Sequence, residues 1–487
     1  MNEAGESKDP PSFAVQRNPR LRVLVPLVVA SAFLMEQLDS TVITTAIPRI
    51  AEDLDTNVLR LNLAVTVYVL TLAVFIPVSG WFADRFGARR IFVTAVLIFT
   101  FSSALCGLAD NLTELVITRT LQGLGGAMMT PVGRLILLRS FPREQLLNAM
   151  VYVSLPALIG PVVGPLVGGV LTSYVSWRWI FYINIPFGVI GVILALCFIE
   201  DTRPEHHTRF DFRGFIFAGF GLAFLQLGVE NSGRPLLPQI ATVISIAVAI
   251  VLLAAFLLHA RRHPSPAINL SLFRLRSFWV GTLGGGLSRI GINAVPFLLP
   301  LMLQVGFGLS PVESGSLTFF TAFGTLMIRL VSSRALRFLG FDRVLPIAAA
   351  VNAIVIAGFA LIDAQTPHWL IAGYIVIFGI ARSTQFMTSN SLAYAEMPAE
   401  ELSGATSLGG VLQQLSVSFG VSTAALILAA VSNQGTGLQV ADFHEAFLLV
   451  GLIPLLALPA FLRLRPEDGV AVSGHSRRSR QARSGDH

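Results

Sequence analysis

Apolar segments long enough to cross a lipid bilayer recur from one end of this 487-residue sequence to the other. A membrane-spanning helix needs about 20 consecutive apolar residues. Hydrophobic residues make up 54% of the chain and charged residues only 13%, whereas soluble proteins carry about 25% charged residues. Inside a bilayer the backbone polar groups must be paired within the protein, which a helix achieves within one segment. The sequence therefore predicts an all-α integral membrane protein without a sizeable soluble domain.

Fourteen segments have the length and hydropathy expected of membrane spans. They lie near residues 22–48, 58–82, 90–108, 112–138, 146–173, 179–199, 213–231, 236–259, 277–305, 311–332, 344–362, 368–391, 400–430 and 443–463. The first segment is too long and too acidic for a cleaved signal peptide, and no small-residue cleavage site follows it. An even number of spans places both termini on the same side of the membrane.

The basic residues predict which side this is. When the N-terminus is placed in the cytoplasm, most of the 34 Lys and Arg residues fall in cytoplasmic loops and tails. The residues on the opposite side are Arg49, Arg60, Arg178 and Arg234. Because positively charged loops stay in the cytoplasm, we expect a multi-pass protein of the cytoplasmic (inner) membrane with both termini inside. The net charge of +6 is then a topology signal rather than a sign of nucleic-acid binding.

The residue inventory excludes several classes of function. Lys occurs once, at Lys8, so the folded part of the chain cannot contain a G-x-x-x-x-G-K-[ST] phosphate loop, and an ATP-driven pump of that type is excluded. The eight His residues fall in loops, tails or at span ends, so no buried histidine relay is expected. Cys106 and Cys197 both lie in predicted spans and imply no disulfide framework. No Ser-His-Asp set, Cys/His metal cluster or dinucleotide turn can be assembled at one membrane depth. The sequence therefore favours a transporter over an enzyme and predicts no metal, cofactor, ATP or nucleic-acid partner.

Two acids, Glu36 and Asp39, lie deep within the first predicted span, and no other predicted span carries a carboxylate as deep. The i, i+3 spacing puts them on one helix face, about 4.5 Å apart along the axis. A charge at the middle of a bilayer costs roughly 2.5–3.5 kcal/mol, so intramembrane acids face a cavity or a partner. With histidine excluded, these two carboxylates are the predicted proton-carrying groups or the site for a substrate cation.

A short loop between the second and third predicted spans carries a specific motif. It reads Gly80-Trp-Phe-Ala-Asp84-Arg85-Phe-Gly87-Ala-Arg89-Arg90. Gly80 permits close helix packing and Gly87 can adopt positive φ where the chain reverses, while Asp84 can pair with an Arg of a neighbouring helix and cap a helix N-terminus. The loop resembles the signature G-x-x-x-D-R-x-G-x-[R/K] of the major facilitator superfamily. This resemblance implies a cytoplasmic latch that closes and releases during transport.

A decayed copy of this loop occurs between the predicted tenth and eleventh spans. It reads Arg334-Ala-Leu-Arg337-Phe-Leu-Gly340-Phe-Asp342-Arg343. Two six-span halves related by such a repeat are the facilitator architecture, and the seventh and eighth spans are then an insertion between the halves. The expected parts are a cytoplasmic N-terminal tail (1–21), an N-terminal six-helix bundle (22–199), a linker with two extra spans (200–276), a C-terminal six-helix bundle (277–463) and a disordered cytoplasmic tail (464–487).

Two further spans carry motifs of this superfamily. In the fourth span, Arg119 stands among small residues in the run Leu115-x-x-x-Arg119-x-x-Gln122-Gly123-x-Gly125-Gly126-Ala127, and the family's matching motif implies a role for Arg119 in proton transfer. The fifth span contains Gly160-Pro161-x-x-Gly164-Pro165-x-x-Gly168-Gly169. Prolines bend a helix and a glycine stripe lets it pack closely. This run resembles the motif of the exporting, antiport branch, although an ordinary kinked packing helix is the structural alternative.

The first and sixth spans resemble a subfamily. The run Leu38-Asp39-Ser40-Thr41-Val-Ile-Thr44-Thr45-Ala-Ile47-Pro48 is similar to the L-D-x-T-x-x-N-x-A-L-P signature of fourteen-span drug:proton antiporters of the EmrB/QacA type. The run Trp177-Arg-Trp-Ile-Phe-Tyr-Ile-Asn184-Ile-Pro186-Phe-Gly188 resembles the start of their sixth span. Thr44 replaces the usual Asn, and Glu36 adds an acid to the pattern.

Structural alternatives stand beside these functional assignments. Asp39 is either a proton or cation site or an acid tied to an Arg or to backbone, and Glu36 is either a coupling acid or the partner of an intramembrane Arg such as Arg289. Arg119 acts in proton coupling or in a buried structural ion pair. Arg289 and Arg382 are candidates for substrate binding or coupling, and Gln122 is a candidate cavity residue. For Gln385, Gln413 and Gln414, a place in the cavity lining and helix–helix hydrogen bonding are both open.

Together these features predict a proton-coupled, alternating-access exporter of drugs or other small amphipathic compounds. Its expected partners are a small-molecule substrate, protons and the lipid bilayer, and it is expected to be a monomer, with any adaptor protein unidentified. The alternatives are a dedicated exporter of one endogenous metabolite, a proton-coupled importer, and a transport-inactive sensor or scaffold.

Overall fold

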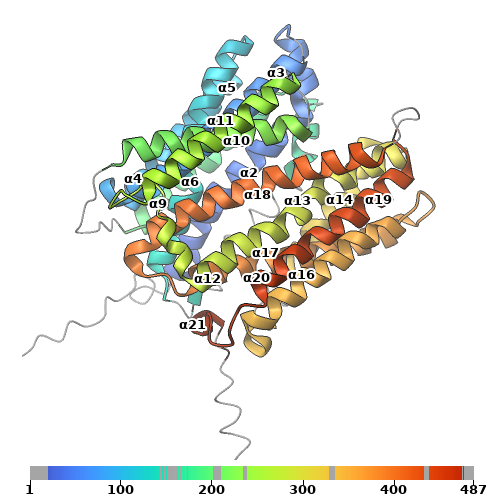
Figure 1. Cartoon of the computed structure of the whole chain (residues 1–487). Helices are drawn as coiled ribbons and strands as arrows, with labels where there is room; N and C mark the ends of the chain where they lie inside the picture. The colour runs from blue at the N-terminus through green and yellow to red at the C-terminus, as the bar shows by residue number, and fades with distance from the viewer. Residues whose placement is uncertain are drawn as a thin grey trace, which may run out of the picture.

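In a computed structural model, helices are the only regular secondary structure in the described part of the chain (Figure 1). The described part comprises residues 20–56, 58–142, 145–146, 149–150, 160, 163–164, 166–172, 174–200, 210–233, 238–327, 335–432, 438–473 and 475. Eleven helical segments within it are long and apolar enough to cross a membrane, and they match eleven of the predicted spans. Of the other three, 112–138 forms α6 (Leu112–Ser140), 311–332 begins with α14 (Pro311–Leu326), and 146–173 lies largely outside the described residues. The total of fourteen stays a prediction.

One group of helices precedes residue 200. Its members are α2 (Leu21–Asp53), α3 (Val58–Phe75), η1 (Ile76–Val78), α4 (Ser79–Phe86), α5 (Ala88–Gly107), α6, α8 (Trp179–Tyr182) and α9 (Asn184–Phe198). Helices α5 and α6 pack along each other, α3 packs on α6, and α2 packs on α9. The N-terminus of α6 is fixed by Asn111, whose side chain accepts a hydrogen bond from the Glu114 N–H.

A second group follows residue 269. It consists of η2 (Leu270–Arg274), α12 (Arg276–Trp279), η3 (Val280–Gly284), α13 (Gly285–Leu301), η4 (Met302–Gly306), α14, α16 (Phe341–Ala357), η5 (Gly358–Leu361), α17 (His368–Ala395), η6 (Ala399–Glu401), α18 (Leu402–Val431), α19 (Val440–Leu452), η7 (Ile453–Ala457), α20 (Leu458–Phe461) and α21 (Val470–Ser473). The π-helical turns η3 and η4 flank α13. Helix α18 also packs on α4, η1 and α6, so it joins the two groups.

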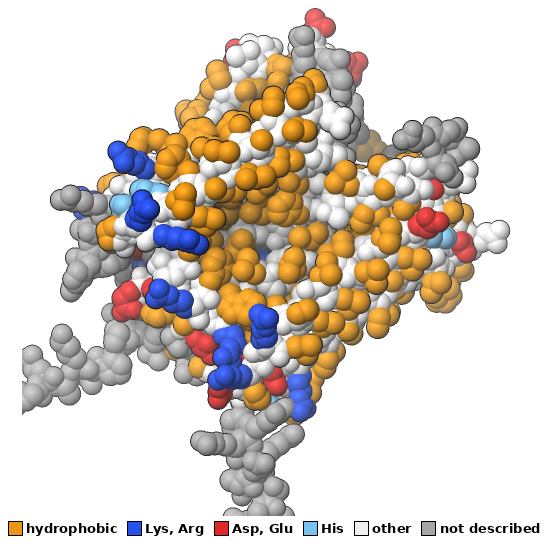
Figure 2. Space-filling view, in the orientation of Figure 1, with side chains coloured by type: hydrophobic (Ala, Val, Ile, Leu, Met, Phe, Trp, Pro, Cys, Tyr) orange, Lys and Arg blue, Asp and Glu red, His pale blue; other side chains and the backbone are white. Residues whose placement is uncertain are grey.

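The two groups meet at one end and diverge toward the other (Figure 1). The end where they meet carries α4 and the start of α18, and Figure 2 shows Lys and Arg side chains gathered there on the visible face. Hydrophobic side chains cover most of the remaining visible surface (Figure 2). This distribution is that of a membrane protein whose sides face lipid and whose charges lie in water.

A helical hairpin connects the groups. Helix α10 (Phe212–Gly233) packs on α11 (Gln239–Ala260), and it also packs on both α3 and α18. The Gln226 amide donates a hydrogen bond of 2.5 Å to the Ser418 hydroxyl of α18. Helix α11 lies on the outside, since only 17% of its most apolar window is buried. The inserted hairpin therefore contacts both groups rather than standing apart from them.

The expected disordered tail 464–487 needs a correction. Residues 464–473 fold back onto the helices, with α21 against α17 and the Val472 side chain buried. The Gly469 N–H donates to the Glu396 carboxylate over 2.9 Å. The sequence indicated only a charged segment. The apolar side chains of Leu464, Val470 and Val472, however, bury enough surface to keep residues 464–473 packed against the helices.

Candidate functional site

Asp39 lies in a buried polar network rather than in lipid. Its carboxylate accepts from Arg119 Nη1 at 2.6 Å, from Gln122 Nε2 at 2.8 Å and from Asn184 Nδ2 at 3.3 Å. The Asp39 side chain is 1% exposed and that of Arg119 is 0% exposed. Helices α2, α6 and α9 supply these groups, so one buried carboxylate joins three helices. The network can hold a charge pair in the bilayer because the two charges are paired and hydrogen-bonded.

Arg119 also connects this network, through Tyr68, to the central cavity. Its guanidinium carbon lies 4.3 Å from the centroid of the Tyr68 ring, a cation–π distance. The Tyr68 hydroxyl and Arg119 Nη2 are buried and have no hydrogen-bond partner in the described part of the chain. Tyr68 also lines the central cavity, so a single side chain contacts both the ion pair and the cavity.

Glu36 faces that cavity. The cavity has a volume of about 310 Å³ and lies between the two helix groups. The Glu36 carboxylate is half-buried and accepts a hydrogen bond from the Thr130 hydroxyl of α6. One turn of α2 therefore places Glu36 toward the cavity and Asp39 in the sealed network. The proposed ion pair of Glu36 with Arg289 is absent from the ion pairs of the described residues, although both side chains line the same cavity.

Two arginines of the second helix group line the cavity on the side opposite Glu36. Arg289 of α13 is 5% exposed and Arg382 of α17 is 7% exposed. Arg289 donates only a long hydrogen bond of 3.3 Å to Asn390, lies 5.1 Å from the Phe386 ring centroid and leaves its Nε without a partner in the described part of the chain. Among the described residues, Arg382 makes no hydrogen bond or ion pair. Within the described part of the chain, neither positive charge has a carboxylate within ion-pair distance.

Arg134 bridges the two helix groups beside the cavity. It donates to the Gln413 side chain over 2.8 Å and to the Tyr394 hydroxyl over 3.2 Å. Gln413 and Gln414 line the cavity, as do Arg289 and Arg382. Gln122 and Gln385 do not line it, which corrects the expectation for these two. Gln122 is bound into the Asp39 network, and Gln385 is fully buried against Ser389.

The loop motif lies where the two helix groups meet. Asp84 pairs with Arg139 of α6 at 2.9 Å and accepts a hydrogen bond from the Ser403 hydroxyl in the first turn of α18. The sequence led us to expect that Asp84 would also cap a helix N-terminus. Among the described residues, however, its carboxylate accepts no hydrogen bond from the backbone of α18. Gly87 adopts φ 93° and Gly340, its counterpart in the decayed copy, adopts φ 78°, so the predicted positive φ is confirmed. Arg85 is exposed, and Arg89 donates to the Ile199 carbonyl over 3.2 Å.

Gly80 permits the contact between the groups. Its N–H donates to the Ser407 hydroxyl at 2.8 Å, and Ser79 and Ser407 share a hydrogen bond of 2.9 Å. A Cβ at Gly80 would approach within 2.8 Å of the Ser403 carbonyl carbon. Helices α4 and α18 can therefore touch here only because residue 80 has no side chain.

The fifth-span motif is described in part. Pro161 and Pro165 lie outside the described residues. Gly160 and Gly164 pack against α2, where added Cβ atoms would overlap Gln37 and Thr41. Gly168 is buried, whereas a Cβ at Gly169 would meet open space, so Gly169 does not serve close packing. Two of the glycines thus allow this segment to approach α2 beside the acid pair.

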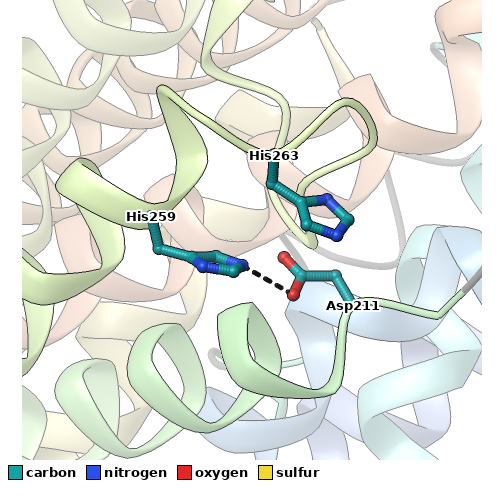
Figure 3. Close-up of side chains that lie close together, drawn as sticks. All are labelled: Asp211, His259 and His263. Atoms are coloured by element: carbon teal, nitrogen blue, oxygen red, sulfur yellow. Dashed lines mark hydrogen bonds and ion pairs between the residues drawn. The ribbon is translucent and has the colours of Figure 1, made fainter.

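A group with the composition of a metal site lies at the base of the hairpin (Figure 3). Ligand atoms of Asp211, His259 and His263 lie within 4.8 Å of one another, and no pattern in the sequence had indicated this group. The Asp211 carboxylate accepts from His259 Nε2 at 2.8 Å and from the N–H groups of Gly214 and Ala267 at 2.9 and 3.1 Å. Burial raises the pKa of Asp211, but these hydrogen bonds outweigh it and hold that pKa below its usual value. The carboxylate already ties the two hairpin ends together.

The sequence singled out Asp39, Glu36 and Arg119 but missed the residues that connect them. Tyr68 and Thr130 belong to other helices and show no distinctive local pattern. Thr130 lies eleven residues after Arg119, close to three helical turns, which places both on one face of α6. That spacing could have identified Thr130 from the sequence. The place of Tyr68 could not be identified in this way, because it depends on how α3 packs against α6.

Comparison with known proteins agrees with this architecture. Residues 29–421 match the model of the Major Facilitator Superfamily. Relatives designated multidrug resistance protein MdtD include one from Pectobacterium atrosepticum, 38% identical, and one from Escherichia coli (strain 55989 / EAEC), 36% identical, each with 93% of this chain aligned to 97% of the relative. The crystal structure of the human organic anion transporter MFSD10 (TETRAN) matches with a TM-score of 0.65 at 15% identity, covering 91% of this chain and 99% of that one. At that identity the match shows the fold alone.

The family matched by sequence, the helical fold and the membrane-length segments agree with one another. A family of membrane transporters implies a small-molecule substrate and embedding in the bilayer. The chain belongs to the Major Facilitator Superfamily and is a multi-pass membrane transporter rather than an enzyme.

Proposed function

We propose that this transporter is a proton-coupled antiporter that exports drugs or other small amphipathic compounds by alternating access. We place it with the fourteen-span drug:proton antiporters, in the cytoplasmic membrane with both termini inside. Its two six-helix bundles (22–199 and 277–463) then enclose the cavity, with the α10–α11 hairpin inserted between them. The names of the MdtD relatives support a drug substrate.

One observation carries the proposal. A single helix, α2, presents Glu36 to the cavity and, one turn later, Asp39 to a buried arginine. Carboxylates within a membrane protein are costly, so they are kept for ion pathways and proton relays. Here one acid can contact a substrate and the other can exchange its ion pair for a proton.

The mechanism follows from the charges. A substrate amine in the cavity favours the ionised form of Glu36, and a proton arriving from outside neutralises that carboxylate and weakens the contact. Protonation of Asp39 weakens its ion pair with Arg119, which joins α2 to α6. Substrate and proton thus favour different conformations in the alternating-access equilibrium of the transporter. Each net charge that crosses the membrane contributes roughly 2.3 kcal/mol per 100 mV.

The contact between α4 and α18 supplies the gate. In the state described here, Asp84, Ser403 and Ser407 hold the basic end closed. Opening toward that end requires these hydrogen bonds to break. These bonds are few, and exchange with water leaves each intramolecular hydrogen bond a net contribution of only about 0.5–1.5 kcal/mol, which is small enough for a transport cycle to reverse.

Efflux from proteoliposomes tests the proposal. A compound to which expression of the wild-type protein confers resistance is loaded, and a pH gradient is imposed. Wild-type protein should drive efflux, whereas Asp39→Asn should reduce gradient-driven efflux at least tenfold while passive exchange persists. Asp110→Asn, which removes a carboxylate with an exposed side chain, is the matched control and should behave as wild type. Full gradient-driven efflux by Asp39→Asn would rule Asp39 out as the coupling site.

A further inference from the structure

We propose that the cavity selects amphipathic ampholytes, compounds that carry an amine and an acidic group on one apolar frame. The amine would contact Glu36 and the acidic group would contact Arg289 and Arg382. This inference deepens the proposed function, and it relies on that function for the direction of transport but not for binding.

The charge inventory of the cavity is the first argument. Its charged lining residues in the described part of the chain are Glu36, Arg289 and Arg382. With Glu36 ionised the lining carries a net charge of one positive unit, and neighbouring Arg134 adds another. A simple lipophilic cation would therefore meet a net repulsive field, and a simple anion would leave Glu36 without a cation. A compound with both charges satisfies both sides.

The second argument is the position of these charges. Glu36 belongs to α2 in the first helix group, whereas Arg289 and Arg382 belong to α13 and α17 in the second. A bound ampholyte would pair its amine with one group and its acid with the other. Such a ligand bridges the two bodies that must move relative to each other, so its binding can be coupled to their closure.

The third argument is that neither arginine forms an ion pair with a described residue. An unpaired buried charge costs several kcal/mol, and Arg289 Nε has no hydrogen-bond partner in the described part of the chain. Guanidinium groups bind carboxylates through two parallel hydrogen bonds. A substrate carboxylate that pairs with them would therefore offset the desolvation cost of these two buried charges.

The rest of the lining matches the apolar frame. Phe33, Tyr68 and Phe386 supply aromatic surface, and Ile292 and Val417 supply aliphatic surface. Gln413, Gln414 and Asn293 add neutral hydrogen-bonding groups. A volume of about 310 Å³ admits a compound of the size of an aromatic amino acid, because ligand pockets run from about 300 Å³ upward.

Matched probes test the inference with the purified full-length protein in detergent. Tryptophan carries both charges, its methyl ester keeps only the amine charge, and N-acetyltryptophan keeps only the carboxylate. Binding is measured by isothermal titration calorimetry at constant pH. Wild-type protein should bind tryptophan at least about tenfold more tightly than either derivative, which is about 1.4 kcal/mol of binding free energy and within what one charge-assisted hydrogen bond supplies.

Variants assign each preference to its residue. Glu36→Gln should abolish the preference for tryptophan over N-acetyltryptophan while keeping its preference over the ester. Arg289→Gln and Arg382→Gln should do the reverse, and Glu36→Asp and Arg289→Lys should restore part of each preference. Arg213→Gln, at an exposed position outside the cavity, is the control and should match wild type.

Several results would overturn the inference. They are equal binding of the three probes, no binding of tryptophan to wild-type protein, and preferences that survive the cavity substitutions. The assay contains no proton gradient, so charge selectivity can hold even when gradient-driven efflux fails. Failure of the proposed function and failure of this inference are therefore separate outcomes.

Discussion

Two acids on consecutive turns of one helix have opposite environments in this transporter. Asp39 has three side-chain donors and no access to the cavity, whereas Glu36 lines the cavity and accepts from Thr130. The difference arises from the neighbours, since α6 and α9 enclose one carboxylate and the interface between the helix groups leaves the other open. The residue that relates them is Tyr68, which contacts both the Arg119 guanidinium and the cavity.

The Asp39–Arg119 pair should be energetically coupled. Removing one partner leaves the other charge buried, and such single substitutions cost about 3–5 kcal/mol. We expect Arg119→Gln to lower the free energy of unfolding by about that amount, and Asp39→Asn/Arg119→Gln to cost clearly less than the sum of the two single changes. Denaturant unfolding of the four proteins in detergent measures this. Additive effects would show that the 2.6 Å contact carries little energy.

At the residue scale, the sequence predicted which charged residues belong to the site better than it predicted their hydrogen-bond and ion-pair partners. Intramembrane charge identified Asp39, Glu36 and Arg119, because charges in a bilayer are rare and costly. Which Arg pairs with which acid depends on helix packing, and the sequence left Arg289 open as a partner of Glu36. Gln122 and Gln385 look alike in the sequence, yet one belongs to the Asp39 network and the other to a buried site beside Ser389.

At the scale of elements, the contact between α4 and α18 depends on the absence of a side chain at residue 80. Gly80→Val would push the two helices apart, because the new carbon atoms overlap the first turn of α18. We expect a longer distance between spin labels on α4 and α18 and a transport rate reduced at least tenfold. Gly169→Val, placed where a Cβ meets open space, is the control. Unchanged label distances in Gly80→Val would contradict the close-packing account.

The base of the α10–α11 hairpin should respond to pH through Asp211. Its pKa is lowered in the folded protein, so its carboxylate stabilises the fold above the unfolded pKa, and this contribution is lost as pH falls through the folded pKa. We expect Asp211→Ala to destabilise the protein by about 1–3 kcal/mol at neutral pH and the difference from wild type to shrink as the pH falls from neutral through the lowered pKa of Asp211. Melting curves of both proteins across this range measure it. A difference that grows on acidification would contradict this role.

Element positions were largely predictable because a bilayer allows few solutions. Eleven spans match, and α6 was predicted despite its charges because its length and position fitted the series. The contacts of the hairpin were not predictable. Nothing in the apolar sequence of α10 indicates that this helix packs on both α3 and α18. Nor does it indicate that the Asp211 carboxylate accepts hydrogen bonds from the His259 ring and the Ala267 N–H.

At the scale of the whole molecule, the proposed transport direction depends on the membrane topology. Fourteen spans with both termini inside place residue 85 in the cytoplasm and residue 363 outside. In a background with Cys106 and Cys197 replaced, Arg85→Cys should react with a membrane-impermeant thiol reagent only from the cytoplasmic side, and Asp363→Cys only from the outside. Labelling of both from one side of oriented vesicles would require a different number of spans between them.

The two copies of the loop motif differ in the side chains that they carry. The decayed loop copy places a positive-φ glycine, Gly340, where the first half has Gly87, but Arg337 stands where the first half has Asp84. The two copies are therefore not equivalent, since Asp84 and Gly80 form hydrogen bonds with α18 and the second copy has no acid at residue 337. The sequence repeat predicted the pairing of the halves, whereas the closed contact at the basic end and the cavity behind it required coordinates.

The most direct test of proton coupling is proton release on ligand binding. Purified protein in weakly buffered detergent is mixed with a compound that stabilises it in a thermal-shift screen, and a pH indicator reports the protons released. Wild-type protein should release protons when the ligand binds, Glu36→Gln and Asp39→Asn should each release fewer, and the double variant should release none. Proton release that is unchanged in the double variant would contradict the central claim that these two carboxylates couple proton movement to transport.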